Sequence, residues 1–264
     1  MKEYLKRIGF VGDGVLDVPP TKPKYADVPP IKPDYVTLSE LQYKHFLNVP
    51  YENLDILRNI PLSLEIKDLY EKIVVNKRGG YCFELNALFN WLLCEIGFKT
   101  TNYFARFLLD EPTIPMRRHR VIRVDIDGVY YLADVGVGSI TPERPLKLVE
   151  NEETEIRGLT YKLNKEPFLG WVLNLKKDGK WQKIYSFTEE QQLEVDYIQP
   201  NFYCQHSPDS IFNKENMVAI RTETGKYTLD GNVFKIIDNG KITKKEYPEN
   251  EIPEILKKYF GIEI

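Results

Sequence analysis

The stretch RGGYCFELN, residues 78–86, places a cysteine where an amphipathic helix should begin. Apolar residues follow at helical spacing, and Gly97 is positioned to end the helix in the left-handed conformation. A thiol at a helix N-terminus feels unpaired N–H groups and the positive end of the helix dipole, and both favour the reactive thiolate. The two glycines permit a tight turn and close approach of a ligand to the backbone. We therefore expect a reactive Cys82, with a half-buried structural cysteine as the alternative if this stretch is taken alone.

The composition is that of an ordinary globular protein. The chain has 264 residues, of which 42% are hydrophobic and 28% charged, and its formal net charge is −3. This balance lacks the basic character of nucleic-acid-binding proteins, and no apolar run approaches the roughly 18 residues of a membrane span. The three cysteines fit neither disulfide nor zinc-ligand spacing. We expect no metal, no nucleic-acid or membrane partner, and, since no signal peptide opens the chain, a cytoplasmic location.

The order of expected elements predicts an α+β protein. The N-terminal third looks mainly helical, because a capping box at 37–40 opens a helix that runs to about residue 48. A second helix is expected over 66–75, and the third begins at Cys82. A last helix is expected over 251–260.

From about residue 100 the pattern changes to alternating apolar residues, which is typical of strands. Asp-Gly and Asn-Gly pairs predict hairpin turns, at 127–128, 178–179, 230–231 and 239–240. The polar stretch 189–192 suggests a short helix or linker after these strands.

A proline-rich direct repeat interrupts the helical part. DVPPTKPKY, residues 17–25, returns as DVPPIKPDY, residues 27–35. Such a segment cannot form a helix interior and should run extended, partly as polyproline II. It is either a surface strap or a docking site for a partner protein.

One of the three histidines is placed to meet a carboxylate. If residues 127–128 form a two-residue turn, His119 falls opposite Gly136, and Asp134 lies on the same face as Gly136. His119 and Asp134 are then diagonal neighbours with Cα atoms roughly 7–8 Å apart, whereas a three-residue loop would put them on opposite faces. Together with Cys82 they form a set in which an oriented imidazole can activate a thiol.

At this point RGGYCFELN resembles the RGGxCxExN motif of the arylamine N-acetyltransferases. Other segments agree with that family in order and spacing: VPYENLD at 49–55, the strand that begins at His119, ADVGVG at 133–138 and SPDSIF at 207–212. The resemblance extends over about residues 1–230 and leaves out the proline-rich repeat.

The resemblance implies a fold of three parts with a cysteine-protease-like catalytic core. The parts are an N-terminal helical bundle with a Pro-rich insert at 15–36, a central antiparallel β-barrel and a C-terminal α/β lid. The domain boundaries expected on this basis are 1–98, 99–200 and 201–264.

The resemblance also implies a ping-pong transfer of an acetyl group from acetyl-CoA to the nitrogen of an arylamine or hydrazine. Cys82 would carry the acetyl group as a thioester, His119 would pair with Cys82, and Asp134 would hold His119. Arg78 and Glu84 match the motif as supporting residues.

The same matching suggests how the substrates bind. Three residues are expected to line the acceptor pocket: Tyr51, Val137 and Phe212. Tyr51 stands where the family usually has Phe, and Val137 stands at a position where the family often has Phe. This pocket should therefore be more polar and roomier than usual. Four residues are expected near coenzyme A: Tyr203, Ser210, Arg117 and Arg118. For the two arginines, a solvated charge pair is an equal alternative to contact with phosphates.

Two other functions use the same features. A papain- or transglutaminase-like hydrolase or acyltransferase would employ Cys82, His119 and Asp134 without acetyl-CoA. A non-catalytic binder would keep the fold and dock a partner through the proline-rich repeat. The segments at 49–55 and 207–212 disfavour the first, and the intact set of three residues disfavours the second.

Overall fold

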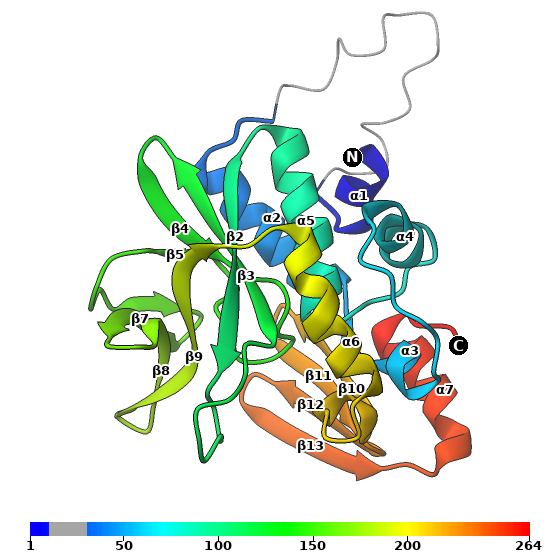
Figure 1. Ribbon diagram of the computed structural model, residues 1–264. Helices are drawn as coiled ribbons and strands as arrows, with labels where there is room; N and C mark the ends of the chain where they lie inside the picture. The colour runs from blue at the N-terminus through cyan, green and yellow to red at the C-terminus, as the bar shows by residue number, and fades with distance from the viewer. Residues whose placement is uncertain (11–30) are drawn as a thin grey trace, which may run out of the picture.

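A computed structural model describes residues 1–10 and 31–264 (Figure 1). The α-helices are α1 (Lys2–Arg7), α2 (Tyr35–Asn48), α3 (Leu54–Leu57), α4 (Ile66–Tyr70), α5 (Cys82–Ile96), α6 (Ile198–His206) and α7 (Ile252–Ile255). Among the described residues, two π-helical turns extend α4 and α7, namely η2 (Glu71–Val75) and η6 (Leu256–Phe260), and three 3₁₀ turns are η3 (Glu194–Tyr197), η4 (Ile211–Asn213) and η5 (Glu249–Glu251).

The strands form two antiparallel sheets. Eight strands have the order β5-β4-β3-β2-β9-β8-β7-β6, and their bounds are β2 (Lys99–Phe107), β3 (His119–Ile126), β4 (Val129–Ala133), β5 (Leu146–Lys147), β6 (Thr154–Ile156), β7 (Leu159–Glu166), β8 (Gly170–Lys177) and β9 (Lys180–Gln191). Five strands have the order β1-β10-β11-β12-β13, with bounds β1 (Tyr51–Glu52), β10 (Met217–Thr222), β11 (Gly225–Asp230), β12 (Val233–Asp238) and β13 (Lys241–Glu246).

The eight-stranded sheet is curled, and its two edge strands follow one another in the sequence. The edge strands β5 and β6 are separated by a short connection, and Glu150 within it forms a bridge with Leu163 of β7. One face of the sheet encloses a cluster of buried apolar side chains that includes Tyr103, Leu173 and Phe187. A sheet that turns its apolar face inward in this way forms a barrel-like core. The mixed α/β architecture agrees with the predicted fold class at this level of detail.

Helix α5 occupies the centre of the molecule, between the eight-stranded sheet and the N-terminal helices (Figure 1). It contacts β2 and β3 on one side and α4 on the other, and its apolar residues Leu85, Leu88 and Leu92 are buried in the largest core cluster. Gly97 ends the helix in the left-handed conformation with φ 108°, as the sequence predicts. The second sheet has a separate core against α7 and η6.

Three local predictions are wrong in detail. The cap of α2 is Asp34, whose side chain accepts a hydrogen bond from the Thr37 backbone N–H at 2.8 Å, so the helix begins before the predicted capping box. The hairpin between β11 and β12 turns at 231–232 instead of 230–231, because Asp230 still pairs with Val233. The polar stretch 189–192 does not form a helix, since β9 continues through Gln191.

The proline-rich repeat lies mostly outside the described residues, which exclude 11–30. Its last residues are part of the fold: Ile31 packs against the core, and the Tyr35 ring lies 4.9 Å from the ring of Tyr131. The predicted insert therefore ends before residue 36, at the start of α2. Among the described residues, no helix combines the length and the apolarity that a bilayer crossing requires. The domain boundaries at 98/99 and 200/201 stay a prediction.

Candidate active site

Cys82 is the first residue of α5 and is almost completely buried, with 3% of its surface exposed. The helix start is stabilised by Glu84, whose Oε2 accepts a hydrogen bond from the Tyr81 backbone N–H at 3.1 Å. The thiol Sγ lies 3.6 Å from the backbone carbonyl of Arg118, just before β3. The helix start therefore presents Cys82 directly to the loop that leads into the histidine strand.

The two glycines before Cys82 serve the contact between two segments rather than a ligand. A Cβ atom on Gly79 would lie 2.0 Å from the Pro50 carbonyl oxygen, and one on Gly80 would lie 2.8 Å from Glu84 Oε2. Neither glycine has a positive φ, and the Gly80 carbonyl accepts from the Glu52 backbone N–H at 2.9 Å. The close approach seen at these glycines is therefore that of residues 50–52 and of Glu84.

A buried charge network joins the two segments. Arg78 donates to both carboxylate oxygens of Glu52, at 3.0 and 3.1 Å, and to Asp55 at 2.8 Å. Lys72 lies 2.8 Å from Asp55 and 2.7 Å from Glu84. Burial alone would raise the pKa of Asp55, but Lys72 and Arg78 together lower it. The network fixes the helix start from outside the pocket, which is the supporting position predicted for Arg78 and Glu84.

His119 and Asp134 meet as the hairpin register predicts. Ile126 pairs with Val129 across the two-residue turn, and His119 Nε2 lies 2.8 Å from Asp134 Oδ2. Burial alone would raise the pKa of Asp134, but His119 and further hydrogen bonds lower it, so the carboxylate stays ionised at neutral pH. With Nε2 engaged, Nδ1 is the imidazole nitrogen that remains for a second partner.

Asn86 is a residue whose role the sequence reasoning missed. Its Nδ2 donates to Asp134 Oδ1 at 2.9 Å and to the Arg120 carbonyl, and its Oδ1 accepts from the Val135 backbone N–H at 2.9 Å. It thereby links the helix that carries Cys82 to the strand and loop that carry His119 and Asp134. The signal was present, because Asn86 is four residues after Cys82 and lies on the same helix face.

The segment 134–136 packs tightly on the first turn of α5. A Cβ atom on Gly136 would lie 2.8 Å from Cys82 Cα and 2.5 Å from Asn86 Nδ2. The Gly136 backbone N–H donates to Asp134 Oδ1 at 2.8 Å, so this carboxylate is held by His119, Asn86 and its own chain. Tyr185 completes the surroundings, with its ring 5.2 Å from that of His119.

The environment of the thiol differs from the sequence-based expectation. Burial raises the pKa of Cys82 well above its ordinary value, and Cys204 and the Asp134 carboxylate add to the rise. Backbone hydrogen bonds from Arg120 and Phe83 act in the opposite direction and are weaker. Burial therefore opposes the effect of the helix start, so a Cys82 thiolate needs a positively charged partner.

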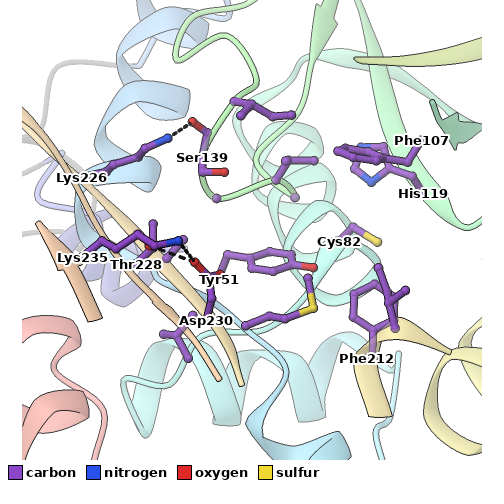
Figure 2. Close-up of a pocket in the computed structure, with 18 of the residues that line it drawn as sticks. Tyr51, Cys82, Phe107, His119, Ser139, Phe212, Lys226, Thr228, Asp230 and Lys235 are labelled. Atoms are coloured by element: carbon purple, nitrogen blue, oxygen red, sulfur yellow. Dashed lines mark hydrogen bonds and ion pairs between the residues drawn. The ribbon is translucent and has the colours of Figure 1, made fainter. Parts of the chain in front are cut away.

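A pocket of about 330 Å³ opens in front of Cys82 and His119 (Figure 2). The three residues predicted for an acceptor pocket, Tyr51, Val137 and Phe212, all line it. β1 brings Tyr51 to this wall, because Tyr51 pairs with Ala219 of β10 and bridges to Gly80. The pocket can hold a small, mostly apolar molecule next to the thiol.

Of the four residues predicted near coenzyme A, Arg118 lines the pocket and the other three lie outside its wall. Arg118 lines the pocket and pairs with Glu111, whereas Arg117 lies outside its wall and pairs with Glu190 at 3.0 Å. Ser210 is buried, and its hydroxyl donates to the Cys204 carbonyl at 2.8 Å. Tyr203 packs against the apolar cluster around Cys82. Among the described residues, no group of three or more His, Cys, Asp or Glu side chains is arranged to hold a metal ion.

Comparisons with known proteins agree on one family. The family model described as N-acetyltransferase matches residues 34–264. The arylamine N-acetyltransferase of Escherichia coli is 32% identical over 230 residues, which cover 86% of this chain and 82% of that protein. The structure of the Salmonella typhimurium arylamine N-acetyltransferase superposes with a TM-score of 0.87 at 29% identity, covering 99% of this chain and 90% of that one. The Mycobacterium marinum arylamine N-acetyltransferase in complex with CoA gives 0.86 at 28% identity, with 99% and 92% coverage.

Proposed function

This chain belongs to the arylamine N-acetyltransferase family and is an acyltransferase, and on that premise we propose that it transfers an acetyl group from acetyl-CoA to an arylamine or hydrazine nitrogen through a thioester on Cys82. The observation that carries the proposal is the meeting of Cys82, His119 and Asp134 at one end of a mostly apolar pocket. The CoA complex of the M. marinum relative supports acetyl-CoA as the donor.

In the first half-reaction, the Nδ1 atom of His119 takes the proton of the Cys82 thiol. The thiolate attacks the acetyl carbonyl carbon, the bond from that carbon to the sulfur of coenzyme A breaks, and the leaving sulfur receives the proton from His119. In the second half-reaction, the amine nitrogen attacks the thioester, His119 accepts a proton from the nitrogen, and the Cys82 sulfur leaves.

Asp134 stabilises the imidazolium that forms in both half-reactions and fixes its tautomer through Nε2. Because burial raises the pKa of Cys82, the thiolate forms as the partner of protonated His119 and not as an isolated anion. This pairing keeps the net charge of the buried site unchanged when the proton moves from sulfur to nitrogen.

The substrates occupy different parts of the site in this proposal. The acceptor lies against Tyr51, Val137 and Phe212, and acetyl-CoA approaches past Arg118.

We also propose the three-part division into a helical bundle, a barrel and a C-terminal lid. The second sheet has its own apolar core, which supports treating the C-terminal lid as a separate part.

The intact mass of the protein tests the thioester. Mixing with acetyl-CoA alone should add one acetyl group, peptide mapping should place it on Cys82, and adding 4-methylaniline should remove it and yield the acetylated amine. A papain- or transglutaminase-like enzyme would gain no mass from acetyl-CoA. Label on Cys94 or Cys204, or no label at all, would refute the assignment.

A further inference from the structure

Two parts of the chain meet at the pocket, and both line it. Residues 136–140, in the loop after β4, form one side, and side chains of β10, β11 and β12 in the second sheet form another (Figure 2). The two parts touch, because a Cβ atom on Gly138 would lie 2.7 Å from the Ala219 Cβ atom of β10. The position of the second sheet against this loop therefore determines the shape of the pocket.

Side chains from several elements hold the loop in place. Residues 134–145 belong to no helix or strand, so their carbonyl groups need partners from elsewhere. Four consecutive carbonyls accept hydrogen bonds from four different elements: Ser139 from Lys226 of β11 at 2.9 Å, Ile140 from Tyr161 of β7 at 3.2 Å, Thr141 from Arg221 of β10 at 3.0 Å and Pro142 from Gln42 of α2 at 2.9 Å. The bonds from Lys226 and Arg221 connect the loop to the second sheet.

Arg221 makes the stronger of these two connections, because it also binds a carboxylate. Its Nη1 donates to Glu143 Oε1 at 3.0 Å while its Nη2 donates to the Thr141 carbonyl, and both Arg221 and Glu143 are buried. A bond between two charged groups is stronger than one between an ammonium and a neutral carbonyl. Arg221 lies outside the pocket lining, so it acts on the pocket only through the loop and β10.

A second arginine completes the connection. Arg157, in the turn between β6 and β7, donates from Nη1 to Glu143 Oε2 at 2.8 Å and to the Thr222 carbonyl at 3.2 Å. Glu143 thus joins the loop to both sheets. Because Arg157 also neutralises Glu143, loss of the Arg221 side chain would not leave a buried carboxylate without a cation.

The neighbouring residue of the loop, Arg144, is bound in another direction. It pairs with Glu40 of α2 at 2.5 Å, and its guanidinium carbon lies 4.2 Å from the centre of the Tyr43 ring. These contacts fasten the loop to the helical part of the chain and not to the second sheet. Arg144 and Arg221 are therefore two arginines with carboxylate partners at the same loop, and they differ in the element that each one connects to it.

We propose that the Arg221–Glu143 pair is a latch that fixes the second sheet against residues 136–143 and thereby sets the width of the acceptor space next to Cys82. Arg221 and Glu143 are positioning residues that fit the pocket to acceptors of one size. The inference rests on the proposed function and adds the residues that determine acceptor size. Without the latch the sheet and the loop can separate, so a single ring loses contacts whereas a larger ring system loses few.

The test compares 4-methylaniline, which has one ring, with 2-aminofluorene, which has three fused rings, at saturating acetyl-CoA. Arg221→Met should raise KM for 4-methylaniline about 10-fold, the order expected when an apolar pocket loses the fit of one methylene group. KM for 2-aminofluorene should change by less than twofold. With both acceptors kcat should stay within threefold, because the groups at Cys82 are unchanged. Arg144→Met is the matched control and should leave both KM values within twofold.

Two further measurements decide the question if Arg221→Met folds poorly. Glu143→Gln keeps the volume of the side chain and removes its charge, so the ratio of the two KM values should shift in the same direction by a smaller factor. Hydrogen exchange followed by mass spectrometry should be faster in Glu143→Gln than in the wild type for peptides from 137–145 and 217–230. Peptides from α5 should exchange at the same rate in both proteins.

Each other outcome overturns a definite statement. An unchanged KM ratio in folded Arg221→Met overturns the inference, and so does an equal rise of both KM values or a loss confined to kcat. The same shift in Arg144→Met overturns the assignment of the effect to the second sheet. Single-turnover acetylation of Cys82 by acetyl-CoA involves no acceptor and should stay within twofold in Arg221→Met. A wild-type protein that acetyl-CoA does not acetylate would refute the proposed function, which separates that failure from failure of this inference.

Discussion

The two ends of helix α5 carry the same side chain in opposite surroundings. At the N-terminal end, Cys82 is 3% exposed and lies among groups from four other parts of the chain. At the C-terminal end, Cys94 is exposed, and its Sγ lies 3.3 Å from Thr100 Oγ1. At the first end Glu84 and Asn86 are held by hydrogen bonds, whereas Glu95 at the second is exposed.

This difference shows that neither the residue type nor the helix position is sufficient for a reactive site. Burial by itself makes the Cys82 thiol harder to ionise. What distinguishes this end of α5 is the imidazole and carboxylate that the barrel-like sheet brings to it. The following experiments alter one end of the helix and use the other as its control.

Removing the thiol should have the largest effect. Cys82→Ala should lower acetyl transfer by at least about 10⁴-fold, because covalent catalysis is lost, and Cys82→Ser should come close, because a hydroxyl does not ionise here. Cys94→Ala should stay within twofold of the wild type. Steady-state rates with 4-methylaniline measure both, and an inactive Cys94→Ala protein of native fold would remove the contrast between the two ends.

Removing the carboxylate should have the next largest effect. Asp134→Asn should lower acetyl transfer by about 10³- to 10⁴-fold while the protein stays folded, because the imidazole loses its orienting anion. The pKa of Asp134 is lowered, so its support is present at neutral pH and is lost only as the pH falls through that lowered value.

The pH dependence of alkylation by iodoacetamide distinguishes a thiolate–imidazolium pair of Cys82 and His119 from an isolated Cys82 thiol. In the wild type, Cys82 should already react quickly near pH 7. In Asp134→Asn its rate should rise only above the ordinary thiol value of about 8.5, because burial alone raises the pKa of Cys82. Identical profiles for the two proteins would show that no pair forms.

Removing Asn86 should have an intermediate effect. Asn86→Ala should lower kcat by roughly 10- to 100-fold with little change in KM, since Asp134 loses a hydrogen bond and α5 loses its link to the histidine strand. Asn90 is one turn later on the same helix, and its Oδ1 has no partner among the described residues. Asn90→Ala should therefore stay within twofold, and equal losses in both variants would mean that the helix, not the contact, is responsible.

The smallest effect should be on stability rather than on rate. Lys72→Met should lower the free energy of unfolding by about 3 kcal/mol, because it leaves Asp55 and Glu84 buried without one of their cations. Glu95→Gln, at the exposed end of α5, should change it by less than about 0.5 kcal/mol. Urea denaturation midpoints measure the difference, and a Lys72→Met protein as stable as the wild type would show that this network does not hold the helix start.

Much of the site follows from patterns within short stretches of the chain. The start of α5 at Cys82, its end at Gly97 and the register that joins His119 to Asp134 depend on helix capping and on a two-residue turn. These are set by hydrogen bonds between near neighbours, so a single sequence contains the information. The turn at 231–232 shows the limit, because a shift of one residue was decided by the pairing of whole strands.

Contacts between distant segments were decided only by the tertiary structure. Positions 79 and 80 need glycine because a Cβ atom would clash with the carbonyl of Pro50 and the side chain of Glu84. The raised pKa of Cys82 comes from burial, which no local pattern reveals. Lys226 reads in the sequence as one more surface lysine of a hairpin, and only the folded structure brings it into the wall of the pocket that contains Cys82. The sequence by itself determined which groups can react, since that depends on residue type and local geometry. The tertiary structure decided what surrounds them, since burial and charge balance arise only when remote segments pack together.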